Sequence, residues 1–241
     1  MLIPEMYRPR RPADVVDLVR SNPLALVACN GAETPFATHA PVIIDQMAAE
    51  PDEGEPLVGA TLLGHLNRRN EHWRALREGA KVLAVFQGPD FYISPVAYRQ
   101  RPAAPTWNFA TVHLRGTVEP IPAGEPTLEV VTATVRALEK VAGTAWDMTD
   151  SLHYFRRIQP GVGAFRVHVE SAEAMFKLSQ EHPPEVRRSI REHLLAHGGG
   201  RSRELAESMW AAEFAADDRG RAPLPADASD ADDGGDDGCD F

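Results

Sequence analysis

The chain has 241 residues and a formal net charge of −10, with 35 acidic and 25 basic side chains. Nine aspartates and two arginines between residues 217 and 241 contribute −7 of this charge, which leaves −3 on the preceding body. Because that body has no basic surplus, it lacks the electrostatic footprint of a nucleic-acid-binding protein, and we expect no nucleic-acid partner. No apolar run is long enough to span a bilayer and no signal peptide is recognisable, so we expect a cytoplasmic protein without a membrane partner.

The two cysteines lie in different kinds of sequence, Cys29 in an apolar run and Cys239 in a polar terminal stretch. They therefore predict neither a disulfide framework nor a zinc site. Residues 217–241 are rich in Asp, Gly, Ala and Pro and poor in large apolar side chains. We interpret this stretch as an acidic disordered tail, and the remaining length allows one main domain with appendages.

Short apolar runs separated by turn signals dominate the body of the chain. They predict strands at 24–28, 36–44, 57–66, 82–87, 91–94, 111–120 and 162–169, and an exposed acidic loop at 47–56. Helices are predicted around 15–19 and at 71–77, 128–141, 185–197 and 203–214. Because long helices do not alternate with the strands, the pattern favours a mainly β fold with flanking helices, an α+β protein built on a barrel. A small barrel fills its own interior, so a cofactor must lie at its edge or between subunits.

Aromatic and polar side chains are concentrated in two neighbouring segments, Gly-Pro-Asp-Phe-Tyr-Ile-Ser-Pro from residue 88 and Pro-Thr-Trp-Asn-Phe from residue 105. A plain core hairpin needs a short Gly/Asn turn, which these proline-rich segments lack. We interpret Tyr92, Tyr98 and Trp107 as surfaces for a planar cofactor, with Ser94 and Asn108 as polar contacts. The alternative is that these aromatic side chains are ordinary core residues.

A second group of polar side chains follows the strand predicted at 57–66, in the run Gly-His-Leu-Asn-Arg-Arg-Asn. The imidazole of His65 could ligate a metal, while Arg68 and Arg69 could pair with anionic groups. The alternative is a strand-end histidine bonded to the backbone, with both arginines solvated. His113, on the polar side of the strand at 111–120, is the rival ligand or a second contact to the substrate, and His39 ranks third.

Lys177 stands between Phe176 and Leu178 in the run Phe-Lys-Leu-Ser-Gln. Apolar neighbours would partly desolvate its ammonium group, which suits the side chain to act as a base. The alternative is a lysine that extends to solvent or pairs with an acid.

The order Gly-Pro-x-x-Tyr-Ile-Ser-Pro, Pro-Thr-Trp-Asn-Phe and Lys-Leu-Ser-Gln resembles the PaiB-like proteins, flavin-binding split-barrel regulators, over about residues 5–197. The chain looks most similar to one enzymatic branch, the haem-dependent piperazate synthases. PaiB proteins usually show Ser-Trp-Tyr where this chain has Val96, Ala97 and Tyr98. This departure favours haem b as the cofactor, with FMN as the alternative.

The resemblance implies a dimeric, FMN-binding-like split β-barrel at 1–170, a helical extension at 171–216 and the tail at 217–241, with the cofactor between subunits. It implies an enzyme that cyclises N5-hydroxy-L-ornithine to L-piperazic acid, forming an N–N bond with loss of water, for nonribosomal-peptide antibiotic biosynthesis. By the same resemblance His65 is the haem-iron ligand, and the other expected cofactor contacts are Arg69, Tyr92, Ser94, Tyr98, Trp107 and Asn108. The expected catalytic residues are Lys177, His113 and Arg68. The alternatives are an FMN-binding regulator and a flavin reductase.

Overall fold

The computed structural model describes residues 1–46 and 56–214. The loop expected at 47–56, except for its last residue, and the tail expected at 217–241 lie outside the described residues. Within the described ranges, no helix is long and apolar enough to cross a membrane.

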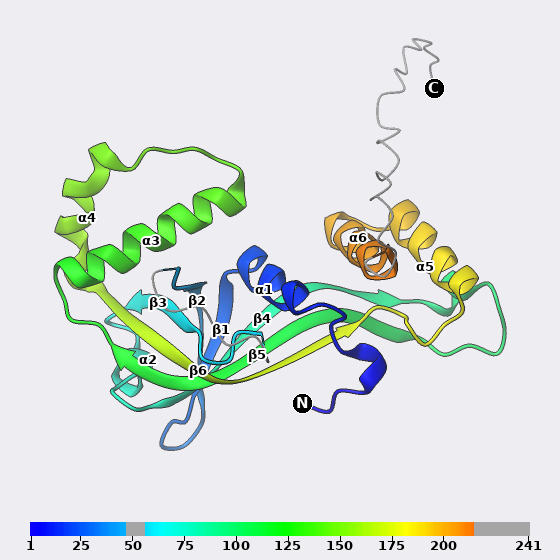
Figure 1. The fold of residues 1–241 in the computed structure, drawn as a ribbon, viewed down its shortest axis with the longest axis horizontal. Coiled ribbons are helices and arrows are strands. Elements are labelled where there is room, and N and C mark those ends of the chain that lie inside the picture. The colour runs from blue at the N-terminus through cyan, green and yellow to red at the C-terminus, as the bar shows by residue number, and fades with distance from the viewer. Residues whose placement is uncertain (47–55, 215–241) are drawn as a thin grey trace, which may run out of the picture.

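Six antiparallel strands close into a barrel in the order β1-β2-β3-β6-β5-β4 (Figure 1). The strands are β1 Leu24–Cys29, β2 Phe36–Ile44, β3 Thr61–Asn67, β4 Lys81–Ile93, β5 Thr106–Pro120 and β6 Val162–Lys177. Alternate residues along each strand are buried, as in β1, where Ala25, Val27 and Cys29 point into the barrel. The expected mainly β fold with flanking helices is thereby confirmed.

Close packing fills the barrel interior. At Gly64 in β3, an added Cβ would lie 2.5 Å from the buried ring of Phe165 in β6, so this position admits only glycine. Helix α1, Pro12–Ser21, places Val15 and Val19 in the same core cluster, and Trp73 of the short helix α2, Glu71–Ala75, packs against that cluster. The interior has no room for a cofactor, as expected for a small barrel.

Two helices between β5 and β6 cover one outer side of the barrel. In α3, Glu125–Ala142, Val130 packs with Leu63 of β3 and Ala164 of β6. Helix α4, Leu152–Ile158, follows α3, and the four short 3-10 helices are η1 Glu5–Tyr7, η2 Pro95–Tyr98, η3 Thr149–Ser151 and η4 Gln159–Gly161. The sequence pattern did not predict α4, because its seven residues are too few to show a helical period.

Beyond the barrel, β4, β5 and the end of β6 continue as a three-stranded arm. The β4–β5 register shifts between Gln87 and Asp90, and pairing then continues to Ile93 opposite Thr106. The arm therefore corrects two expectations: the aromatic segments do form a hairpin, and the strand expected at 91–94 belongs to the arm rather than to the barrel. Strand β6 also runs through the domain boundary expected at 170, because its last residues pair with β5.

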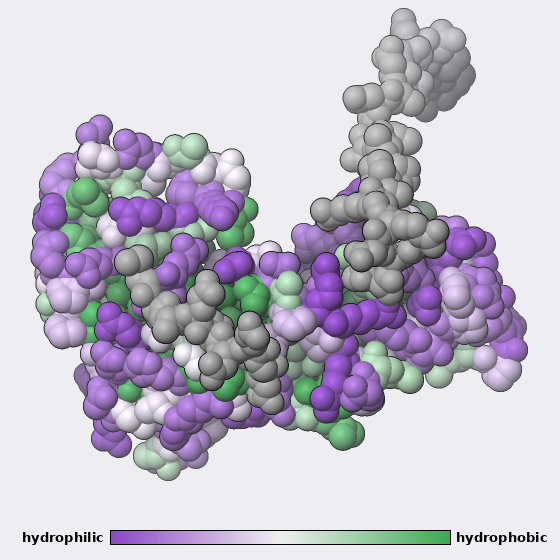
Figure 2. All heavy atoms as spheres, in the orientation of Figure 1, coloured by the Kyte–Doolittle hydropathy of each residue, from purple (hydrophilic) through white to green (hydrophobic). Residues whose placement is uncertain are grey.

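Helices α5, Pro184–His197, and α6, Gly200–Phe214, pack against one side of this arm. The contact between the helix pair and the arm buries Ile190 of α5 and Leu205 of α6 together with Ile93, Tyr98 and Leu178 of the arm. The surface is hollowed between this helix pair and the α3–α4 layer, where α1 lies (Figures 1 and 2). The chain thus has a barrel end and an arm end, which β6 connects.

Candidate functional site

The expected site residues lie in three separate places along the barrel and arm. His65, Arg68 and Arg69 lie at the end of β3, and His113 lies in the middle of β5. Lys177, Tyr92, Tyr98 and Trp107 belong to the arm.

His65 is half-buried on the outward side of β3, two residues beyond Leu63, which packs against α3. Its Nδ1 atom is buried and has no hydrogen-bond partner among the described residues. Burial lowers the pKa of His65, because desolvation disfavours the charged imidazolium. The side chain is therefore a neutral imidazole with a buried, unpartnered nitrogen, which is the state in which histidine ligates a metal.

The two arginines after His65 differ in their surroundings. Arg68 donates from Nε to the carbonyl of Val162 at 2.8 Å, and its guanidinium lies 5.3 Å from the centre of the Trp73 ring. Arg69 is exposed, and its backbone N–H donates to the side chain of Asn67. Arg68 thus ties β3 to β6, while the guanidinium of Arg69 extends toward solvent at the same end of the barrel.

His113 lies in a row that crosses five neighbouring strands, with His39, Leu26, Val85 and Glu173. Burial is the main cause that lowers the pKa of His113, and the nearby Arg115 lowers it further. Arg115 and the N-terminal ammonium both form ion pairs with Glu173, which lower the pKa of that carboxyl to about 2.

This outward side of the barrel is apolar around the row. Leu26, Ala28, Leu83 and Val85 are half-buried, and Leu24 is 64% exposed. Their strands β1 and β4 are neighbours, so these side chains form one continuous patch.

The arm holds the densest group of titratable side chains, centred on Lys177. The ammonium of Lys177 donates to the hydroxyl of Thr106 and lies 6.0 Å from the centre of the Tyr7 ring. The pKa of Tyr7 is raised first by burial and then by the charge of Glu181 and a hydrogen bond to it. Lys177, Tyr7 and Glu181 therefore form one connected polar cluster.

Tyr98 extends this cluster. Its ring lies 4.9 Å from the ring of His182, whose Nε2 is 3.9 Å from a carboxylate oxygen of Glu181. Burial raises the pKa of Tyr98, and the charges of Glu181 and Tyr92 raise it further. Tyr7, Glu181 and His182 were not among the predicted site residues. Their signal in the sequence was the resemblance, since Tyr7-Arg-Pro resembles the opening of the PaiB-like proteins and the run from Glu181 resembles the synthase branch.

Tyr92 and Trp107 are opposite each other in the β4–β5 ladder. Because Phe91 and Ile93 pack with residues of α5 and α6, alternation along β4 places Tyr92 on the other side of the arm. Their ring centres are 6.2 Å apart, and the side chains are 46% and 50% exposed. The indole Nε1 donates to Asp90 at 3.2 Å, which fixes the plane of Trp107. The ring planes differ by 55°, so a flat ligand that stacks on one ring meets the other ring at an angle.

Asn108 and Ser94 serve the arm's own structure. Asn108 is fully buried and donates from Nδ2 to the hydroxyl of Ser179 at 2.7 Å. Ser94 accepts a hydrogen bond from the backbone of Val96 and so caps η2. Ser94 therefore has a structural partner, whereas the Oδ1 atom of Asn108 is buried and has no hydrogen-bond partner among the described residues.

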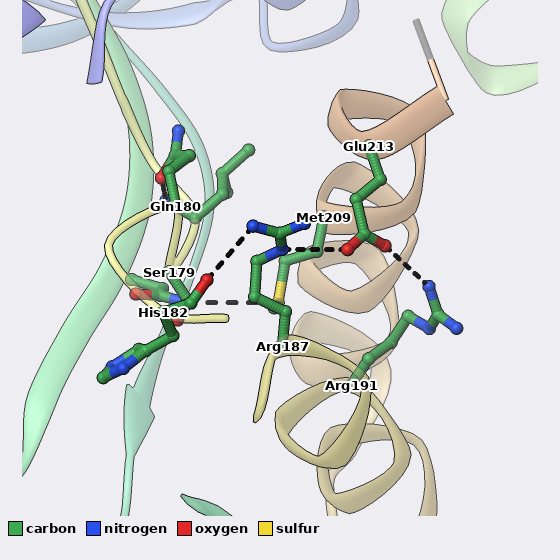
Figure 3. A network of polar contacts seen from close by, with 9 residues as sticks. Ser179, Gln180, His182, Arg187, Arg191, Met209 and Glu213 are labelled. Carbon is green, nitrogen blue, oxygen red and sulfur yellow. Dashed lines mark hydrogen bonds and ion pairs between the residues drawn. The ribbon is translucent and has the colours of Figure 1, made fainter. Parts of the chain in front are cut away.

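An ion-pair network links α5 and α6 beside Ser179 (Figure 3). Arg187 donates to the carbonyl of His182 and to Glu213, which also accepts from Arg191 at 3.3 Å. Arg191 in turn lies 4.1 Å from the centre of the Trp210 ring. The network holds the helix pair on the arm and so fixes the loop that carries Glu181 and His182.

Two of the three places, those of His65 and Lys177, are far apart within one chain. His65 pairs with Ala164 of β6, whereas Lys177 lies at the other end of the same strand (Figure 1). At a rise of about 3.3 Å per residue, the roughly 13 residues between Ala164 and Lys177 span about 40 Å. One chain therefore cannot bring His65 and Lys177 to the same small molecule.

The closed antiparallel barrel with its titratable side chains on the outside defines a split-barrel protein of the FMN-binding class. Residues 1–171 match the family described as "Putative FMN-binding domain", and the chain belongs to this family. The PaiB-like resemblance is thereby confirmed at the level of the family.

One curated relative is "Protease synthase and sporulation protein PAI 2" of Bacillus subtilis, which is 26% identical over 87% of this chain and 96% of its own length. An uncharacterized protein of Saccharomyces cerevisiae is 39% identical over 34% of this chain and 46% of its own length. Among solved structures, a conserved hypothetical protein of Mycobacterium tuberculosis has a TM-score of 0.50 at 14% identity, covering 76% of this chain and 94% of that one. An FAD- and haem-binding protein of Mycobacterium smegmatis has a TM-score of 0.47 at 18% identity, covering 79% and 80%.

Proposed function

We propose that this protein is a haem-dependent cyclase that converts N5-hydroxy-L-ornithine to L-piperazic acid, forming an N–N bond with loss of water, in natural-product biosynthesis in the cytoplasm. The observation that carries the proposal is the buried, unpartnered Nδ1 of the neutral His65. A flavin needs no imidazole ligand, whereas haem iron takes histidine as a common axial ligand.

The residues present fit a haem group held between two chains. His65 would ligate the iron, Arg69 would pair with a propionate, and the exposed rings of Tyr92 and Trp107 would cover the macrocycle. When bound, the haem supplies a Lewis-acidic iron that weakens the N–O bond of the hydroxylamine.

The chain's own residues have two tasks in the cyclisation. The substrate's α-ammonium must lose a proton before its nitrogen can attack N5, and Lys177, beside Tyr7 and Glu181, is the group we assign to take it. As the N–N bond forms, the N–O bond breaks, and the departing hydroxide takes a proton to leave as water. The step is a net dehydration and needs no external oxidant. An arginine holds the carboxylate, so that the two nitrogens meet, and the candidates are Arg68, Arg69 and Arg115.

Two chains are required to assemble this site. His65 and Lys177 lie about 40 Å apart along β6, and the apolar patch around Leu26 and Val85 offers a surface for a second copy. We therefore propose a homodimer in which His65 of one chain serves the arm of the other.

Absorption spectra of the purified protein test the cofactor. An intense Soret band with turnover of N5-hydroxyornithine supports the proposal, while flavin absorption without a Soret band overturns it.

A mixed dimer tests the arrangement of the site. In a dimer of one His65→Ala chain and one Lys177→Met chain, a site shared between chains leaves one intact pair and about half the wild-type turnover. If each site belonged to one chain, both sites would be inactive.

The second candidate is an FMN-binding regulator or flavin reductase, which the family's description favours. A regulator must contact DNA phosphates, and α6 exposes Glu204 and Glu207, which oppose such contact. Retention of FMN through purification, together with sequence-specific DNA binding, would favour the regulator.

A further inference from the structure

Two histidines lie together on α5, away from the residues discussed above. His193 and His197 are four residues apart, and in a helix this spacing places both side chains on one face. They line a hollow of about 340 Å³ between α5 and η2, which Glu192 and Arg99 also line. The site described above uses none of these four side chains.

The two imidazole rings stack on each other, with centres 4.5 Å apart and planes that differ by 22°. Both imidazoles therefore lie within reach of one ion. Nδ1 of His197 lies 3.2 Å from the backbone carbonyl of His193. A carbonyl can only accept, so Nδ1 carries the proton and Nε2 keeps its lone pair. Metal-ligating histidines are commonly oriented in this way, by a hydrogen bond from the other ring nitrogen.

We propose that His193 and His197 form a binding site for a divalent transition-metal ion. Imidazole nitrogen suits Zn²⁺, Ni²⁺ and Cu²⁺, and the usual order of affinities makes Cu²⁺ the tightest of these. Within the described ranges, no group of three or more His, Cys, Asp and Glu side chains is arranged around a metal position. The site therefore has two protein ligands, and water fills the remaining positions.

Glu192 places a negative charge beside the two histidines. Its carboxylate lies 3.5 Å from the guanidinium of Arg99, which follows η2. Because Ser189 of the same helix donates to the carbonyl of Ala97 at 2.7 Å, the site lies where α5 is attached to the tip of the arm. Metal binding there would stabilise the folded chain by mass action.

Zinc titration of the full chain, purified without a histidine tag and treated with a chelator, tests the proposal. Calorimetry should show one saturable Zn²⁺ site per chain, with a Zn²⁺-dependent rise in melting temperature. In the double variant His193→Ala, His197→Gln, both signals should be lost. A His153→Ala variant, which removes an exposed histidine of α4, should keep both.

Circular dichroism without metal shows whether the double variant is folded, and His197→Gln alone provides a second test, because its side chain is exposed. An at least tenfold weaker Zn²⁺ affinity in His197→Gln supports the site. Equal Zn²⁺ affinity in the wild type and in His197→Gln, or no saturable binding by the wild type, overturns it. Neither result depends on haem or on turnover, so the cyclase proposal is tested separately.

Discussion

The ammonium of Lys177 lies 6.0 Å from the centre of the Tyr7 ring, although the two residues come from opposite ends of the described chain. η1 brings Tyr7 to the end of β6, and Glu181 hydrogen-bonds to the same tyrosine. A cation, a phenol and a carboxylate thus meet on the open side of the arm.

Replacement of Lys177 by methionine should keep the fold and the Soret band but lower turnover by about a hundredfold or more, because a general base is lost. Lys177→Arg should not restore turnover, since arginine holds a charge but does not give up its proton. Lys140→Met, an exposed change on α3, is the control. Near-normal turnover of Lys177→Met would show that Lys177 is not the general base.

Replacement of Glu181 by glutamine should lower the pKa of Tyr7 and Tyr98, because the carboxylate raises both. Burial is the larger cause for each, so part of the shift should remain. Phenolate absorbance followed through an alkaline titration measures the change. Turnover should fall by up to about a hundredfold, while Glu204→Gln on α6 leaves both quantities unaltered. An unchanged titration curve would contradict the assigned contact.

Replacement of His65 by alanine should abolish the Soret band or shift it strongly, because the axial ligand anchors the iron. His113→Ala should keep the band, since His113 lies in the cross-strand row rather than at the end of β3. A normal spectrum for His65→Ala together with a lost Soret band for His113→Ala would identify His113, rather than His65, as the iron ligand.

The buried His72 of α2, close to the end of β3, predicts a pH dependence of stability. His72 lies 3.2 Å from the Cys29 sulfur and 3.0 Å from the Thr38 hydroxyl, and burial lowers its pKa. The unfolded chain takes up this proton near pH 6.5, whereas the folded chain resists it. Stability is therefore highest above about pH 6.5 and falls as the pH decreases below that value.

His72→Leu should be less stable at neutral pH by about 1–3 kcal/mol, because the buried Cys29 sulfur and the half-buried Thr38 hydroxyl lose their contact with the imidazole. Its free energy of unfolding should also decline less steeply between about pH 6.5 and 5. Urea unfolding across this range measures both effects. An equally steep decline in the variant would assign the pH dependence to other groups, such as His65 and His113, whose pKa values burial also lowers.

Replacement of Asn108 by alanine should destabilise the chain by about 1–3 kcal/mol, because Ser179 is left without its buried partner. The haem content of the folded variant should match that of the wild type. Urea unfolding and the Soret absorbance measure the two quantities, with Asn30→Ala in an exposed turn as control. Lost haem at unchanged stability would instead support the sequence-based interpretation of Asn108 as a cofactor contact.

The barrel could be predicted from the sequence because its strands carry local signals. The β2 strand has the predicted bounds, since turn residues precede it and alternate burial runs along it. The arm could not be predicted in the same way. Its hairpin lacks a short turn, and its pairing depends on β6 and the α5–α6 layer, which lie far along the chain.

The candidate site was likewise predictable only where a local sequence signal exists. His65 and Lys177 were recognisable one by one, from a histidine beside arginines and a lysine between apolar residues. Their separation along β6 depends on strand register, and the partners of Lys177 depend on the path of η1. No local sequence pattern predicts the distance between His65 and Lys177 or the partners of Lys177, so both become known only from the structure.

The continuity of β6 limits how the protein can be shortened. The family match ends at residue 171, but β6 continues to Lys177 and supplies the pairing partner for the arm segment of β5. A recombinant fragment that stopped at 171 would leave the β5 backbone from Phe109 to Leu114 as a bare edge beside Trp107. Exposed edges of this kind recruit other strands. Such a fragment should precipitate, whereas one ending at 214 keeps the edge paired and the arm covered.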